Sequence, residues 1–176
     1  LPVSVKTRIG LDKIATEDWC GFLLEQKIDA LTVHGRTAKE KSDVPAHWDE
    51  IAKAVKLRDQ ISPKTIIIGN GDVKNFLDAK CKLQIADVDG VMIGRGVLEN
   101  MACFSPQLTT LSPKENINLL REHLERWEKT WGKTKNFAIM KKFVKAYIKG
   151  WEGAGELRAR LFETNSLKEM EVILET

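Results

Sequence analysis

The sequence predicts an α/β fold in which parallel strands alternate with helices, followed by an all-helical segment. Three observations support this prediction. Short runs rich in β-branched residues recur between amphipathic stretches, as in βαβ units. These runs are apolar without strict alternation, which is typical of strands covered on both faces. After about residue 96 the strand pattern stops and helical periodicity takes over. At 176 residues, 43% hydrophobic and 30% charged, the chain suits one globular domain with a small appendage.

The first part of the chain contains four expected strands and three expected helices. The strands are predicted at 2–10, 30–37, 64–72 and 89–96, and the helices at 16–27, 47–60 and 73–84. In the first helix Thr16 is the expected N-cap, ahead of acidic residues that favour the positive end of the helix dipole. Trp19, Phe22 and Leu23 fall on one face of that helix.

The second part reads as helices alone. Ser112 and Glu115 form a capping box with a proline at the first helical position. The apolar positions that follow are Ile117, Leu120, Leu124, Trp127 and Trp131. A second amphipathic helix is expected at 136–151, with Ile139, Met140, Phe143, Val144 and Tyr147 on its apolar side. Another capping box at 166–169 opens a last helix. We therefore expect an α/β part at 1–104, a linker at 105–111 and a helical domain at 112–176.

Positive charge is concentrated in the helical part. Residues 1–111 carry 15 basic and 15 acidic residues, whereas residues 112–176 carry 13 and 10. The segment 129–149 contains seven lysines and no acidic residue. On a helix, Lys141, Lys145 and Lys149 would form one row, which indicates a polyanionic partner such as an RNA backbone. The alternative is a solvated lysine face without a partner.

The three cysteines, Cys20, Cys81 and Cys103, show no paired spacing. This usage favours reduced thiols in a cytoplasmic protein, and the sequence offers no metal-ligand spacing. No apolar run reaches the roughly 18 residues that span a bilayer, and no signal-peptide pattern opens the chain. The chain begins with leucine directly before a strand, so we expect it to be the C-terminal part of a longer protein.

Polar residues follow the ends of all four expected strands. Because the carboxyl ends of parallel strands share one edge of a sheet, they converge on the side where ligands bind. The residues concerned are Lys6 and Arg8, His34 and Arg36, Asn70, Gly71 and Asp72, and Gly94 and Arg95. Glycine turns let a backbone approach a phosphate, and an arginine adds a charge-assisted contact. The alternatives are that both glycine turns only reverse the chain and that His34 is a hydrogen-bonded structural group.

The four strand-end motifs VKTRIG, LTVHGRT, IIIGNGDV and DGVMIGRG, with a helical tail, resemble the tRNA-dihydrouridine synthase family. The resemblance implies a (β/α)8 TIM barrel of which this chain holds the last four βα units. It implies an enzyme that binds FMN and uses NADPH to reduce uridine to 5,6-dihydrouridine in tRNA, acting as a monomer when full length.

The resemblance also implies roles for individual residues. Lys6 would contact the polar edge of the flavin and His34 would also contact FMN. Asn70, Gly71 and Asp72, with Gly94 and Arg95, would hold the ribityl phosphate. Apart from the resemblance, we expect substrate tRNA to contact Arg8, Arg36, Lys141, Lys145 and Lys149, the three lysines because of their helical spacing. The family's proton donor is a cysteine in a Gly-Cys-Pro-like segment that this sequence lacks, so no residue of this chain is assigned as catalytic, and the chain alone is expected to be inactive.

Two other functions remain open at this point. One is a different FMN-dependent barrel oxidoreductase that acts on a small pyrimidine. The lysine-rich helical part argues against it, because a small substrate needs no such appendage. The other is a non-catalytic RNA-binding remnant that uses the helical part alone.

Overall fold

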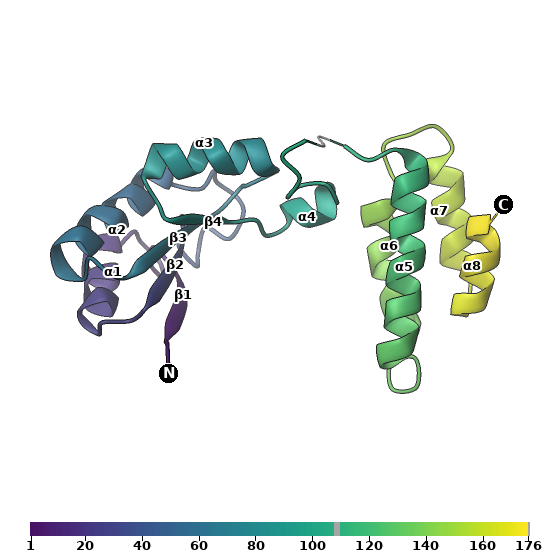
Figure 1. Cartoon of the computed structure of the whole chain (residues 1–176), viewed down its shortest axis with the longest axis horizontal. Coiled ribbons are helices and arrows are strands. Elements are labelled where there is room, and N and C mark those ends of the chain that lie inside the picture. Colours follow the sequence, from purple (N-terminus) through teal and green to yellow (C-terminus); the bar gives the residue numbers. More distant parts are fainter. Residues whose placement is uncertain (108–109, 176) are drawn as a thin grey trace. The chain divides into compact units, whose positions relative to one another are not determined.

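A computed structural model describes residues 1–107 and 110–175 of the chain. The chain divides into two compact units, Leu1–Val97 and Leu98–Thr176, which we call the sheet unit and the helical unit (Figure 1). The linker expected at 105–111 includes residues 108 and 109, which lie outside the described residues. Among the described helices, none combines the length and the apolar composition needed to cross a membrane.

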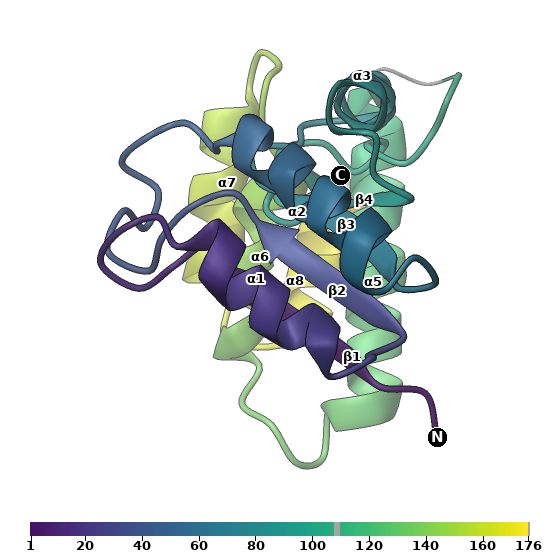
Figure 2. The same ribbon diagram turned by 90° about the vertical axis from the view of Figure 1, so that its left-hand side faces the viewer.

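The sheet unit holds four parallel strands in sequential order: β1 (Ser4–Arg8), β2 (Ala30–His34), β3 (Ile66–Asn70) and β4 (Gly90–Met92). Three helices, α1 (Thr16–Glu25), α2 (Trp48–Ile61) and α3 (Phe76–Ala86), fill the connections between them. Figure 2 shows α1 and α2 in front of the strands. The predicted parallel α/β arrangement is confirmed, and a four-stranded parallel sheet of this kind is consistent with part of a TIM barrel.

The core of the sheet unit lies between the sheet and its helices. Leu31, Val33 and Ile67 are fully buried against side chains of α1 and α2. Side chains alternate between the two faces of a strand, so Lys6, Thr32 and Ile68 belong to the opposite face. On that face Ile66 is 50% exposed. Thr32 on the same face is 7% exposed, so the burial on both faces that the apolar strands suggested is only partial among the described residues.

The first helix differs from its prediction in two ways. Ala15, not Thr16, is the N-cap, and no side chain caps the helix. The Thr16 hydroxyl instead donates to Glu50 of α2 at 2.6 Å, where both side chains are buried. Leu23 packs into the core, but Trp19 and Phe22 are 41% and 52% exposed, so they are not core residues.

The third helix begins later than predicted, at Phe76. Asn75 adopts an extended conformation and its side chain accepts a hydrogen bond from the Asp78 N–H at 2.9 Å. This cap sets the start of the helix. A short polar residue three positions before an acidic one is a typical N-cap pattern.

The division between the two units falls within a short helix, α4 (Gly96–Glu99). The helical unit then contains α5 (Pro113–Trp131), α6 (Ala138–Tyr147), α7 (Ala154–Glu163) and α8 (Leu167–Glu175). The capping box at Ser112 is confirmed: the Glu115 N–H donates to the Ser112 hydroxyl and the Glu115 carboxylate accepts from the Ser112 N–H. The expected helix 136–151 stops at Tyr147, and α7 was not predicted. Gly150 and Gly153 have φ values of +83° and +81°, and this left-handed backbone separates the two helices.

Most of the predicted apolar positions form the core of the helical unit. Leu120, Leu124, Met140 and Val144 are fully buried there. The exceptions are two residues, since Trp131 is 48% exposed and Ile139 is 38% exposed. Helical periodicity placed both on the apolar side, but Trp131 is the last residue of α5 and lies beyond the core.

Candidate functional site

The carboxyl ends of the four strands bring polar residues into one row. Strand register pairs Arg8 with His34, His34 with Asn70, and Asn70 with Met92. One step further in, Lys6 pairs with Thr32 on the same face. This face lies opposite the helix-packed core. The predicted convergence of strand-end residues is thus present for Lys6, Arg8, His34 and Asn70.

His34 lies in a positively charged environment. Burial, followed by the charges of Arg8, Lys6 and Arg36, lowers the pKa of His34 from 6.5 to about 4, and Asp72 acts weakly in the other direction. The imidazole is therefore neutral at physiological pH and able both to donate and to accept a hydrogen bond. The neighbouring cations disfavour protonation of His34 because they repel a further positive charge. The same positive potential favours the binding of an anion.

Arg36 and Asp72 form an ion pair that closes this end of the sheet. The Arg36 guanidinium donates to the Asp72 carboxylate at 2.5 Å and to the Val44 carbonyl at 2.6 Å. The same carboxylate oxygen accepts from the Ala46 N–H at 2.9 Å. Burial acts to raise the pKa of Asp72, but these bonds outweigh it and hold the pKa below its usual range. Arg36 is 3% exposed, so it faces the protein interior and is not placed to contact tRNA as predicted.

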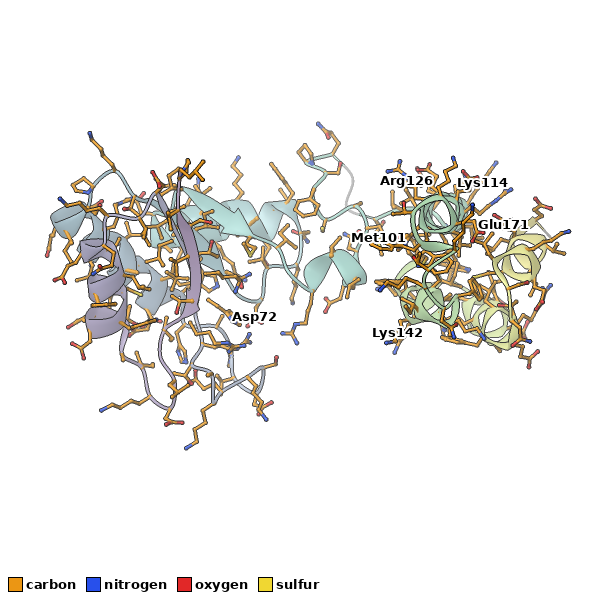
Figure 3. All side chains as sticks on the ribbon, turned by 90° about the horizontal axis from the view of Figure 1, so that it is seen from below. Asp72, Met101, Lys114, Arg126, Lys142 and Glu171 are labelled. Atoms are coloured by element: carbon orange, nitrogen blue, oxygen red, sulfur yellow. The ribbon has the colours of Figure 1, made fainter. Side chains whose placement is uncertain are left out.

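The side chain of Asp72 is not suited to bind a phosphate directly. Its carboxylate is ionised and already bound to Arg36, and an ionised carboxylate repels a phosphate. The residue has a φ of +51° directly after Gly71 at +133°, which turns the chain sharply at the end of β3. Figure 3 shows Asp72 among the loops that follow the strands. Any contact from Asp72 to an anion would therefore use its backbone N–H.

The glycines of the first turn have structural reasons to be glycine. A Cβ on Gly69 would lie 2.6 Å from the Trp48 ring, and a Cβ on Gly71 would lie 2.6 Å from Ala46. The Trp48 indole also donates to the Gly71 carbonyl at 3.0 Å. Sequence reasoning missed Trp48, because nothing in the spacing of the motif links residue 48 to residues 69–71. Trp48 and Ala46 therefore fix this turn from the helix side.

The second turn carries an accessible arginine. Gly94 is exposed, and the only neighbour a Cβ there would meet among the described residues is the Asn70 amide at 4.0 Å. The Asn70 amide donates to the Met92 carbonyl at 2.8 Å, which ties the two turns together. The Arg95 side chain is 68% exposed and lies 4.0 Å from the Asp72 carboxylate. This loose pair leaves the guanidinium available to an anion between the turns.

A loop at residues 37–46 is held beside the same edge of the sheet. Sequence reasoning also missed the residues that hold this loop in place. Arg8 donates to the Thr37 carbonyl at 2.7 Å. The Glu40 carboxylate accepts from the Thr37 N–H at 2.7 Å and lies 3.1 Å from the His47 ring. Arg8 is therefore partly engaged with this loop. Its predicted contact with tRNA stays a prediction.

The lysine row predicted on the helical unit is not a row. Because α6 ends at Tyr147, Lys149 lies beyond the helix and does not continue the line of Lys141 and Lys145. The Lys141 ammonium donates to the Phe162 carbonyl and that of Lys149 to the Leu98 carbonyl, both at 2.7 Å. Lys145 is exposed, and Lys142 points away from the helices in Figure 3. The accessible charge of α6 thus lies on Lys142 and Lys145.

Two of the three cysteines are fully buried. Burial and the nearby charge of Glu50 raise the pKa of Cys20 to about 11, and burial raises the pKa of Cys103. Both stay protonated inside the core. Cys81 is exposed on α3. That none of them serves as the proton donor remains a prediction.

Taken as chemistry, this edge of the sheet can hold a planar, negatively charged ligand. Lys6 and Arg95 supply positive charge, His34 supplies a neutral hydrogen-bonding ring, and the exposed Gly94 turn leaves room for a phosphate.

Comparisons with known proteins agree with the motifs. The family model described as dihydrouridine synthase matches residues 1–176. A probable tRNA-dihydrouridine synthase of Staphylococcus epidermidis (strain RP62A) is 41% identical over 100% of this chain and 55% of the relative. One from Staphylococcus aureus (strain Mu50) is 41% identical over 99% and 54%, and probable tRNA-dihydrouridine synthase 2 of Bacillus subtilis (strain 168) is 37% identical over the same shares. The chain spans about half the length of these curated relatives.

Proposed function

Because the chain belongs to the dihydrouridine synthase family, we propose that it is the flavin- and tRNA-binding part of an enzyme that reduces uridine to 5,6-dihydrouridine in tRNA. NADPH is the proposed reductant. The observation that supports this proposal best is the row of strand ends, where Lys6, His34 and Asn70 share one face of the sheet with Arg95 nearby. An electropositive, partly buried edge of this kind suits an anionic cofactor.

The residues fit FMN in a specific way. When bound, FMN would supply the hydride that the uracil ring receives. The Lys6 ammonium would stabilise negative charge on the polar edge of the ring, and the neutral His34 ring would donate or accept a hydrogen bond beside it. Arg95 would bind the phosphate, with the Gly71 and Gly94 turns offering backbone N–H groups. Asn70 and the Arg36–Asp72 ion pair would hold the two turns in place.

The proposal extends to the fold and to the partner. The sheet unit would be half of a closed eight-stranded barrel, and the helical unit would be a tRNA-binding domain of a cytoplasmic, monomeric enzyme. Lys142 and Lys145 are the accessible cations of α6 that support tRNA contact. The proton donor to the uracil ring would come from outside these 176 residues.

The cofactor assignment is tested on a full-length protein that carries this chain. We expect it to purify with FMN, and we expect Arg95→Ala to weaken retention by about 1.5–3 kcal/mol, because a charged partner of the phosphate is lost. Lys64→Ala is the matched control, since Lys64 is an exposed cation that precedes β3 at the opposite edge of the sheet. Flavin absorbance after dialysis is the measurement. Equal occupancy in the Arg95→Ala and Lys64→Ala variants would contradict the phosphate site.

The activity is tested separately. We expect NADPH-dependent formation of dihydrouridine in a tRNA transcript by the full-length protein and none by residues 1–176 alone. Dihydrouridine formation by the isolated chain would show that a residue of this chain supplies the proton.

A further inference from the structure

Trp131 is an exposed aromatic residue in a position where its sequence pattern predicts burial. It is the last residue of α5 and its side chain is 48% exposed, whereas Trp127, about one helical turn earlier, is 8% exposed. The helix ends at this point, and the chain continues through a loop to α6 at one end of the helical unit (Figure 1). Other aromatic side chains of this chain are exposed as well, among them Phe104 and Phe162, so exposure alone does not indicate binding and the surroundings of Trp131 have to supply the evidence.

Backbone hydrogen bonds hold this loop in one conformation. The N–H groups of Thr134 and Lys135 both donate to the Trp131 carbonyl at 2.8 Å, and the Gly132 N–H donates to the Glu128 carbonyl at 3.0 Å. A side chain at Gly132 would be crowded, since a Cβ there would lie 2.7 Å from the Glu128 backbone carbonyl oxygen. The indole is thus presented on a fixed turn, which reduces the ordering cost of binding a partner.

The loop around the indole is rich in lysine, with one acidic side chain, Glu128, beside Gly132. Lys129, Lys133 and Lys135 are all exposed, and residues 129–149 contain seven lysines without an acidic residue. The Lys135 ammonium lies 5.7 Å from the centroid of the Trp131 ring. Within the described ranges 1–107 and 110–175, none of these three lysines is in an ion pair. Their charge is therefore available to a polyanion.

We propose that this loop, residues 129–136, binds RNA by stacking one unpaired nucleobase on the Trp131 indole while its lysines contact the flanking phosphates. The inference rests on the proposed function, because it takes the RNA to be the tRNA substrate. Any nucleobase offers an aromatic face, so such stacking tolerates sequence variation, and the lysines supply charge complementarity along the strand.

A second exposed tryptophan, Trp19, differs from Trp131 in its contacts. Trp19 is 41% exposed, but its ring stacks on Phe22 at 6.0 Å and its indole N–H donates to the Thr7 hydroxyl. Its helix begins with the acidic residues Glu17 and Asp18. Trp19 also lines a pocket with Lys6 and Arg8, so it is too close to the candidate site to serve as a control. Phe22, which is 52% exposed on the same helix and is not among the residues that line this pocket, is the control.

The test measures binding of residues 1–176 to a labelled tRNA transcript as a function of salt. Trp131→Leu should weaken binding about 5- to 100-fold, the range expected for one stacked base, without changing the slope of log affinity against log salt. Trp131→Phe should retain much of the affinity, because a phenyl ring still stacks, and Phe22→Leu should bind as the wild type does. Lys133→Gln combined with Lys135→Gln should lower the slope by about 1.5.

Different outcomes separate this inference from the proposed function. If the wild-type chain binds tRNA and Trp131→Leu binds equally well, the stacking role is overturned while the proposed function stands. Absence of tRNA binding by the wild-type chain at low salt would overturn the inference and count against tRNA as the substrate. Binding of the wild type and of Trp131→Leu to anionic phospholipid vesicles is measured in parallel. If the substitution weakens vesicle binding but leaves tRNA binding unchanged, the loop is a membrane contact and the inference is also overturned. If Trp131→Leu also lowers the midpoint of urea unfolding, its tRNA affinity is compared with that of Trp131→Phe under conditions where both variants are folded to the same fraction. Equal affinities of the two variants would then overturn the stacking role.

Discussion

The pKa of His34 depends on both its burial and the charges around it, so its change on removing a cation measures the charge at the candidate site. Burial and three cations lower the pKa of His34 from 6.5 to about 4. At pH 6.5 half of an ordinary imidazole is protonated, but for His34 the protonated fraction would be roughly 0.3%. Replacing Lys6 with glutamine removes one of the cations and should raise the pKa of His34. Arg8→Gln should raise it further, because Arg8 is the larger charge effect.

The assay is an NMR titration of the imidazole resonances in residues 1–176, which contain three histidines. His123 is the internal control, because burial alone lowers its pKa and no cation contributes among the causes resolved. Its titration should be the same in the wild type and in both variants. A wild-type His34 that titrates near 6.5, or one unmoved by Arg8→Gln, would refute the picture of an electropositive edge.

The same shift has a consequence for stability. Since the folded state holds His34 with a lower pKa than the unfolded chain, the unfolded chain binds the proton first as pH falls. Stability is therefore full above pH 6.5, declines between 6.5 and about 4, and changes no further below that. The full difference corresponds to roughly 3 kcal/mol, which solvent screening at a half-buried ring reduces to about 1–2 kcal/mol. His34→Gln should remove this part of the pH dependence in urea unfolding.

Two further predictions concern the turns that shape the site. Arg36→Met should destabilise the sheet unit by about 2–4 kcal/mol in urea unfolding, because it leaves the Asp72 carboxylate without its main partner. Adding Asp72→Asn should recover part of that loss, and a double variant no more stable than Arg36→Met would speak against the pairing. Gly71→Ala should cost about 1–3 kcal/mol from its φ of +133° alone, with a further cost from contact with Ala46. Gly155→Ala, inside α7, should instead stabilise the chain by about 0.5–1 kcal/mol, so equal effects of the two alanines would contradict the strain argument.

The parts of the fold that sequence reasoning identified correctly depend on neighbours within a few residues. The alternation of strands and helices follows from local periodicity, and the Ser112–Glu115 capping box is complete within four residues. The convergence of Lys6, His34 and Asn70 also followed from the sequence, because parallel strands place their carboxyl ends at one edge. Each of these features depends only on residues within one helix or strand, or on the direction in which a strand runs.

Side-chain partners that are far apart in the sequence were decided only by tertiary packing. Arg36 pairs with Asp72 and Thr16 with Glu50, each across more than 30 residues, and no local pattern distinguishes such pairs from residues left free in solvent. Periodicity likewise states which residues share a helical face but not where the neighbouring helices stop. That limit is why Trp131 belongs to the apolar stripe by sequence and yet lies exposed at the end of α5, where the core of the helical unit no longer covers it.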